Sequence, residues 1–163
     1  MKKPHTTIGS RMAGVRHDWL AKIEEEILEP ELEIIDPHHH LWDFPEYPYL
    51  LENILADTGS GHTITQTVFL ECNACFRADG PDNEKPIGEV EFVNGIAAMS
   101  ASGAYGETRV ASGIVGLAEL RSGARVQHLL EQQIAAGGGR FKGIRYVASW
   151  DDKEPGIHNG HTN

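Results

Sequence analysis

The spacing of apolar residues along the chain alternates between two periods, one typical of strands and one typical of helices. Short apolar runs rich in β-branched residues predict strands, and apolar residues that recur every three or four positions predict helices. The predicted strands are 32–35, 64–70, 109–117 and 141–147, and the predicted helices are 18–27, 87–98 and 124–136. Pro30 ends the first helix, and Gly137–Gly139 end the last.

The order of these elements is typical of a parallel sheet. After the first helix, strands and helices alternate, with a loop or a short helix between the first two strands. The segment 41–51 in this connection is rich in aromatic residues and proline and is predicted to be a packed loop. Such alternation predicts an α/β fold with right-handed crossovers, either a small open sheet or half of a barrel. We therefore divide the chain into an arm and lead-in helix at 1–30, polar over 1–15, and one α/β domain at 31–163.

The composition of the chain excludes some classes of binding partner. The 163 residues carry 14 Lys and Arg against 24 Asp and Glu, a formal net charge of −10, and 40% of them are hydrophobic. A folded domain without a basic stripe is predicted to bind neither nucleic acid nor a membrane surface. The sequence shows no signal-like or membrane-spanning run, which predicts a cytoplasmic protein. Cys72 and Cys75 form a C-x-x-C pair, which we interpret as ordinary buried or partly buried thiols.

The candidate chemistry lies where the first predicted strand ends, at Asp36-Pro37-His38-His39-His40. Because side chains alternate across a strand, Asp36, His38 and His40 are expected on one face and His39 on the other. Two imidazoles at i and i+2 can bind one metal ion, and a nearby carboxylate can orient a ring or be a ligand itself. The carboxyl ends of parallel strands are also where α/β folds place their sites. The alternative is a polar turn with three solvated histidines.

The segment IIDPHHHLWD, residues 34–43, resembles the opening of the amidohydrolase-related (amidohydrolase 2) family, a group of metal-dependent TIM-barrel hydrolases with lactonase-like members. The resemblance continues, by order and spacing, through VFLEC at 68–72, GIVGLAEL at 113–120 and FKGIRYV at 141–147. It implies that the chain forms the amino-terminal half of a (β/α)8 TIM barrel, with about four parallel strands and their helices. It also implies a hydrolase that acts on a small lactone, ester or amide, or decarboxylates a related acid.

The resemblance further implies roles for individual residues. His38 and His40 would be the H-x-H pair that binds a divalent metal such as Zn or Mn, or that contacts substrate in lactonase-like members that use no metal. Asp36 would support this pair. Arg145 is suited to the carboxylate of a small-molecule substrate, because guanidinium binds carboxylate bidentately, unless it pairs with a neighbouring carboxylate of the protein. Glu71 ends the second strand at the same end as the His pair, either beside the site or facing solvent.

The family's later ligands, on its fifth, sixth and eighth strands, have no counterpart in this sequence, so the chain is expected to be incomplete and inactive alone. Two other interpretations stay open. A half barrel would leave two unpaired strand edges, which favours a non-catalytic domain that associates with another chain, a second copy included. Alternatively, His38 and His40 form a small metal-binding module together with His158 or His161.

Overall fold

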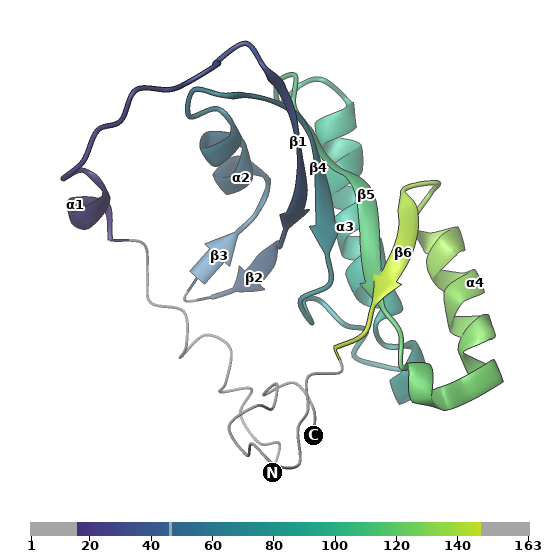
Figure 1. Cartoon of the computed structure of the whole chain (residues 1–163). Coiled ribbons are helices and arrows are strands. Elements are labelled where there is room, and N and C mark those ends of the chain that lie inside the picture. Colours follow the sequence, from purple (N-terminus) through teal and green to yellow (C-terminus); the bar gives the residue numbers. More distant parts are fainter. Residues whose placement is uncertain (1–15, 46, 148–163) are drawn as a thin grey trace, which may run out of the picture.

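The computed structural model describes residues 16–45 and 47–147, which form an α/β fold on one four-stranded parallel sheet (Figure 1). The strand order is β1-β4-β5-β6, and β2 and β3 form a separate antiparallel hairpin. The strands are β1 (Glu33–His39), β2 (Trp42–Phe44), β3 (Tyr47–Tyr49), β4 (Thr63–Leu70), β5 (Arg109–Leu117) and β6 (Phe141–Arg145). The helices are α1 (His17–Leu20), α2 (Leu51–Thr58), α3 (Ile87–Ala101) and α4 (Val126–Ala136), with short 3-10 turns at η1 (Asp82–Glu84) and η2 (Leu120–Arg125).

The four sheet strands and the two longest helices lie where the apolar periods predict them, which confirms the α/β class and the parallel sheet. Strand β5 has the predicted bounds, and α3 begins directly after Pro86. Helix α4 ends at Gly137, after which Gly138 and Gly139 have positive φ angles of 54° and 85°. Glycine adopts these angles without steric cost, so the chain can turn there into β6.

The predicted lead-in helix at 18–27 is wrong beyond its first turn. Helix α1 covers only His17–Leu20, and residues 21–32 form neither helix nor strand. In the described structure most apolar side chains of this segment stay exposed, with Trp19 58% exposed and Ile23 73% exposed. A short helix is marginal in water without tertiary packing, so helical spacing alone does not sustain it.

The prediction of a packed loop at 41–51 is also wrong, because most of this segment forms the β2-β3 hairpin. Trp42 pairs with Tyr49 across the hairpin, with 6.2 Å between the ring centroids. Helix α2 follows at once, and it is the short helix that the predicted element order allows, as the alternative to a loop, between the first two strands. Its buried residues, Leu51 and Ile54, stand three apart and join the core, but eight residues are too few for a clear helical period.

One face of the sheet carries the helices. Phe69 of β4 and Ile114 of β5 are fully buried in a cluster that includes Ile54 of α2 and Val93 of α3. Helix α4 adds a smaller cluster around Leu129. Figure 1 shows α3 behind β4 and β5 and α4 beside β6. This side of the molecule therefore contains the main hydrophobic core.

The opposite face of the sheet carries none of the described longer helices. Its apolar side chains are only partly buried; they are Val68, Leu70, Val115 and Leu117. Among the described strands, β1 and β6 each pair on one side only. Among residues 16–45 and 47–147, the sheet therefore has an unpaired strand at each edge and one face that is open compared with the helical face.

Gly88, in the first turn of α3, packs against the backbone that follows β4. A Cβ atom there would lie 2.5 Å from Arg77 N and 2.6 Å from Cys75 O. Gly88→Ala is therefore expected to lower the free energy of unfolding by about 1–3 kcal/mol through overpacking. Gly95 lies in the same helix with nothing within 4 Å, so Gly95→Ala is expected to raise it by about 0.5–1 kcal/mol. Urea unfolding measures both, and effects of equal sign would contradict this account of the packing.

None of the described helices is long and apolar enough to cross a bilayer. The predicted polar arm at 1–15 lies outside the described residues, and so do the candidate ligands His158 and His161.

Candidate active site at the carboxyl end of the sheet

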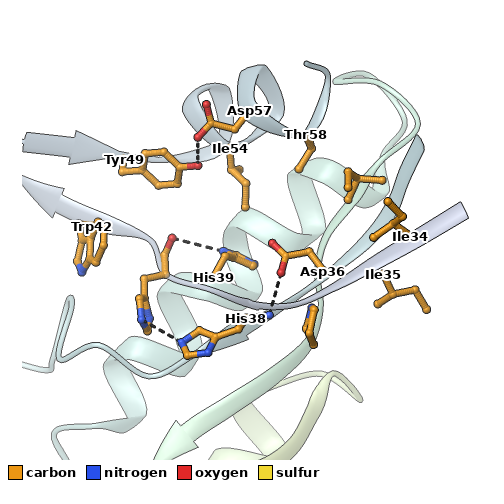
Figure 2. Close-up of a pocket in the computed structure, with 13 residues that line it drawn as sticks. Ile34, Ile35, Asp36, His38, His39, Trp42, Tyr49, Ile54, Asp57 and Thr58 are labelled. Atoms are coloured by element: carbon orange, nitrogen blue, oxygen red, sulfur yellow. Dashed lines mark hydrogen bonds between the residues drawn. The ribbon is translucent and has the colours of Figure 1, made fainter. Parts of the chain in front are cut away.

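His38 and His40 lie next to each other where β1 ends (Figure 2). Their Nε2 atoms are 3.3 Å apart, and the rings meet edge to face with 5.0 Å between centroids. His40 is fixed further by Nδ1, which lies 2.8 Å from the carbonyl oxygen of Leu70 at the end of β4. The structure therefore brings together the two imidazoles that the sequence predicts as a pair.

The contact with Leu70 determines which nitrogen of His40 carries the proton. A carbonyl oxygen only accepts, so Nδ1 donates and Nε2 of the neutral ring keeps its lone pair. Burial lowers the pKa of His40, which favours this neutral form near pH 7. An imidazole that binds a metal through one nitrogen commonly donates the other N–H to a carbonyl or carboxylate in this way.

The separation of the pair suits one metal ion. Two tetrahedral Zn²⁺ ligands at about 2.05 Å from the ion lie about 3.3 Å apart. Within 16–45 and 47–147, however, no third His, Cys, Asp or Glu joins the pair in a metal-ligand cluster. The described residues therefore offer two ligands, fewer than the four positions of a tetrahedral zinc site. Without a metal, His38 Nε2–H can donate to His40 Nε2 instead.

Asp36 does not share a face with the pair, so the predicted alternation is wrong at this residue. Between the aligned pairs Asp36–Thr67 and His39–Phe69, β1 contains two residues and β4 only one, which is a β-bulge. Figure 2 shows Asp36 and His39 on the same side of β1 and the ring of His38 on the other. Asp36 Oδ1 accepts the backbone N–H of His38 at 3.0 Å. In the described structure Asp36 supports the bulge, and no hydrogen bond joins it to either imidazole of the pair.

Glu71 and Arg145 form an ion pair beside the two histidines. Arg145 Nε donates to Glu71 Oε1 at 2.7 Å, and Nη2 donates to the Glu71 carbonyl oxygen at 2.6 Å. Glu71 is 3% exposed, so it does not face solvent. After burial and the Leu70 hydrogen bond, the pKa of His40 responds to the charges of His38, Arg145 and Glu71. The two substrate-binding candidates therefore lie together near the His pair, and Arg145 has the protein carboxylate partner that the alternative interpretation named.

His39 and Thr67 belong to the same region, although the sequence gives them no role. His39 is 8% exposed, and burial lowers its pKa to about 4. Its Nε2 lies 2.9 Å from Thr67 Oγ1, and its ring meets Phe69 edge to face. A lone threonine inside an apolar strand gives no signal of such a contact, since it also fits the strand by β propensity alone.

Glu89 is a second buried group that the sequence analysis misses. Its Oε1 accepts the backbone N–H groups of Cys72 and Ala74, at 2.9 and 2.8 Å. The side chain is fully buried, and burial raises its pKa to about 7. The available signal was a carboxylate inside the apolar helical run after Pro86. Glu89 therefore ties the first turn of α3 to the segment that follows Glu71.

Cys72 and Cys75 are both free thiols, but the interpretation of the C-x-x-C pair as buried or partly buried is confirmed for Cys72 and wrong for Cys75. Cys72 is buried, and its Sγ lies 3.4 Å from the carbonyl oxygen of Leu41. Cys75 is exposed. Burial raises the pKa of both thiols, which is the opposite of what an activated nucleophile needs.

An open cavity of about 570 Å³ extends along β1 towards α2 (Figure 2). Apolar side chains, including Ile34, Ile54 and Ile64, form much of its lining, and it also reaches His38 and His40. The size is sufficient for a small organic molecule.

No family model, no curated protein and no solved structure matches this chain. The similarity to the amidohydrolase-related family therefore stays a resemblance of short motifs.

Proposed function

We propose that this chain supplies the first four strands and the His pair of an amidohydrolase-type (β/α)8 barrel hydrolase, which acts on a small lactone, ester or amide or decarboxylates a related acid. The observation that carries the proposal is the 3.3 Å separation of the His38 and His40 Nε2 atoms at the carboxyl end of a parallel sheet. Parallel α/β folds place their catalytic groups at this end. The sequential strand order and the helices on one face are also what half of such a barrel requires.

Each residue of the site has a chemical task in this proposal. His38 and His40 would hold a divalent metal through Nε2, with the Leu70 carbonyl fixing the His40 ring. A bound metal would polarise the substrate carbonyl and lower the pKa of a water molecule towards about 7. In a site without metal, the neutral His40 Nε2 would accept a proton from water or substrate once its hydrogen bond with His38 Nε2 is broken.

Arg145 supplies the recognition of an acidic substrate. Glu71 holds the guanidinium through Nε and Nη2. In the described structure Nη1 has no hydrogen-bond partner, so its two N–H groups stay for a substrate carboxylate. The proposed substrate is therefore a small organic acid that also carries the lactone, ester or amide group.

Zinc titration tests the His pair. We expect the chain to bind one Zn²⁺ at pH 7.5 in isothermal titration, and His38→Ala/His40→Ala to weaken this binding by at least about tenfold. His62→Ala is the control, because His62 is exposed just before β4, at the opposite end of the sheet. In a complete barrel that contains this chain, hydrolysis of a panel of lactones and esters is expected to be lost in the same double variant. Unchanged zinc binding by that variant of the chain, or unchanged hydrolysis by that variant of the complete barrel, would contradict the proposal.

Association with another chain is a second candidate role, and the free edges of the sheet favour it. In the described part of the chain, β1 and β6 each have one unpaired side, and Ile35 on β1 is 56% exposed. Unpaired edges and exposed apolar side chains favour pairing with a further strand. Light scattering separates the cases: a stable dimer or larger assembly supports this role, and a monomer at all concentrations argues against it.

A further inference from the structure

We infer that Thr67 is a positioning residue, which holds His38 and His40 together by linking two β-bulges through its hydroxyl group. Thr67 lies on β4, in the interior of the sheet, and is fully buried. This role rests on the proposed function, since it assigns Thr67 to the site that the His pair forms. Thr67 itself does not contact the two catalytic imidazoles and acts through His39.

The register of the sheet changes on both sides of Thr67. Towards β1, Thr67 aligns with Asp36, and directly after this pair two residues of β1 lie opposite one residue of β4. Towards β5, Thr67 alone lies opposite residues 110–112. Bulges of this kind interrupt the ladder of backbone hydrogen bonds and redirect side chains, and they are common beside active sites. Something other than the ladder must therefore fix the strands here.

The Thr67 hydroxyl provides that link. Its Oγ1 accepts the backbone N–H of Ala111 at 2.9 Å and lies 2.9 Å from His39 Nε2. Ala111 has a φ of 52°, in the left-handed region that costs a non-glycine residue roughly 1–2 kcal/mol. Such a conformation persists only where the surroundings hold it in place. Here, the Thr67 hydroxyl forms hydrogen bonds with the backbone N–H of Ala111 on β5 and with the ring of His39, which follows the bulge on β1.

Hydrogen-bond chemistry fixes the direction of this chain. The Ala111 amide can only donate, so Thr67 Oγ1 accepts from it. The His40 carbonyl oxygen can only accept, so the proton of the neutral His39 ring lies on Nδ1, 3.4 Å from this oxygen, and the Thr67 hydroxyl donates to Nε2. The chain of donors thus begins on β5, passes through Thr67 and ends on the backbone of His40.

Anchoring His39 determines where its neighbours point. The His39 ring is held on the helical side of the sheet by Thr67 and by the edge-to-face contact with Phe69. Adjacent residues of a strand point to opposite faces, so His38 and His40 lie on the other side, where their Nε2 atoms meet at 3.3 Å. If His39 were released, the bulge would lose its fixed register and the separation of the pair would no longer be defined.

Nitrogen-15 NMR of the histidine side chains in metal-free protein tests this role at pH 7.5. We expect His39 to be the Nδ1–H tautomer in the wild type. Thr67→Val keeps the shape of the side chain but removes the hydroxyl, and it is expected to shift the signals of His39, His38 and His40. It is also expected to weaken Zn²⁺ binding roughly tenfold to 100-fold, the usual effect of losing an outer partner of metal ligands. Thr67→Ser, which keeps the hydroxyl, is expected to retain the wild-type signals and affinity.

Thr65→Val is the matched control. Thr65 is on the same strand, and its Oγ1 donates to the Ile34 carbonyl oxygen at 3.3 Å, across the same β1-β4 pair. We expect it to leave the signals of His38 and His40 unchanged. A wild-type His39 with its proton on Nε2, unchanged His38 and His40 signals in Thr67→Val, or equal losses in Thr67→Ser or Thr65→Val would each overturn the role of Thr67.

Two further results remain decisive for Thr67. If Thr67→Val does not fold, the tautomer of His39 in the wild type and the histidine signals of Thr67→Ser decide whether Thr67 positions the pair. If the double His variant of the complete barrel keeps its hydrolysis, the proposed function fails, whereas the histidine signals in metal-free protein still decide whether Thr67 positions the pair.

Discussion

Arg145→Met is expected to lower the free energy of unfolding by about 2–3 kcal/mol, because it leaves a buried carboxylate without its cation. Glu71 is 3% exposed and receives two hydrogen bonds from Arg145, one to its side chain and one to its carbonyl oxygen. Removing one partner of a buried pair typically costs about 3–5 kcal/mol. The side chain of Arg145 is 35% exposed, so solvent screens part of the interaction. We therefore expect a loss below this typical range. Urea unfolding at pH 7 measures the change.

Arg121→Met is the control for this substitution. Arg121 pairs with Glu119, but the two side chains are 77% and 38% exposed, and exposed ion pairs contribute little to stability. The double variant Glu71→Gln/Arg145→Met removes the unpaired charge and is expected to recover a large part of the stability lost in Arg145→Met. Similar losses in the Arg145 and Arg121 variants, or a double variant less stable than Arg145→Met alone, would show that burial of Glu71 does not govern the pair.

The sheet and its two long helices could be predicted because burial imposes a period on each of them. Strand β5 is the clearest case, since its buried residues occupy most of the nine positions and leave a continuous apolar run. The same reasoning fails for α1, where the helical spacing is present but the described structure buries none of its apolar side chains. It also fails for α2, which holds only two buried residues. The spacing of apolar residues therefore reflects burial. It predicts a helix or strand only where another part of the protein covers the apolar side chains.

In the site too, features set by neighbouring residues could be predicted from the sequence, and features set by contacts between distant residues could not. The pairing of His38 and His40 follows from their spacing on one strand, and the structure has it. The position of Asp36 does not follow, because a bulge between the two reverses the alternation. That bulge depends on contacts with β4 and β5, which are distant in sequence. Likewise, Glu71 and Arg145 are 74 residues apart, so their contact depends on the register of the sheet.

Glu89→Gln is expected to stabilise the protein above pH 7 and to change it much less at pH 4, because a fully buried carboxyl group resists ionisation. Burial raises the pKa of Glu89 from its ordinary 4.5 to about 7, so the folded protein holds this proton more tightly than the unfolded chain does. The protonated group supports folding fully below pH 4.5, and this support is lost as the pH rises to about 7. At about 1.4 kcal/mol per pH unit, the loss is on the order of 3 kcal/mol.

Glutamine imitates the protonated acid, since its amide oxygen can still accept the N–H groups of Cys72 and Ala74 but does not ionise. Urea unfolding of wild type and variant at pH 4, 6 and 8 should give curves that diverge as the pH rises. His39, whose pKa is lowered to about 4, adds a loss of stability on the acidic side, but it does so in both proteins and cancels in the difference. Glu91→Gln is the control on the same helix, because Glu91 is exposed and paired with Arg77, which lowers its pKa instead. Parallel curves for wild type and Glu89→Gln would mean that Glu89 ionises in the folded protein as readily as in the unfolded chain, and that its two amide partners offset the whole effect of burial.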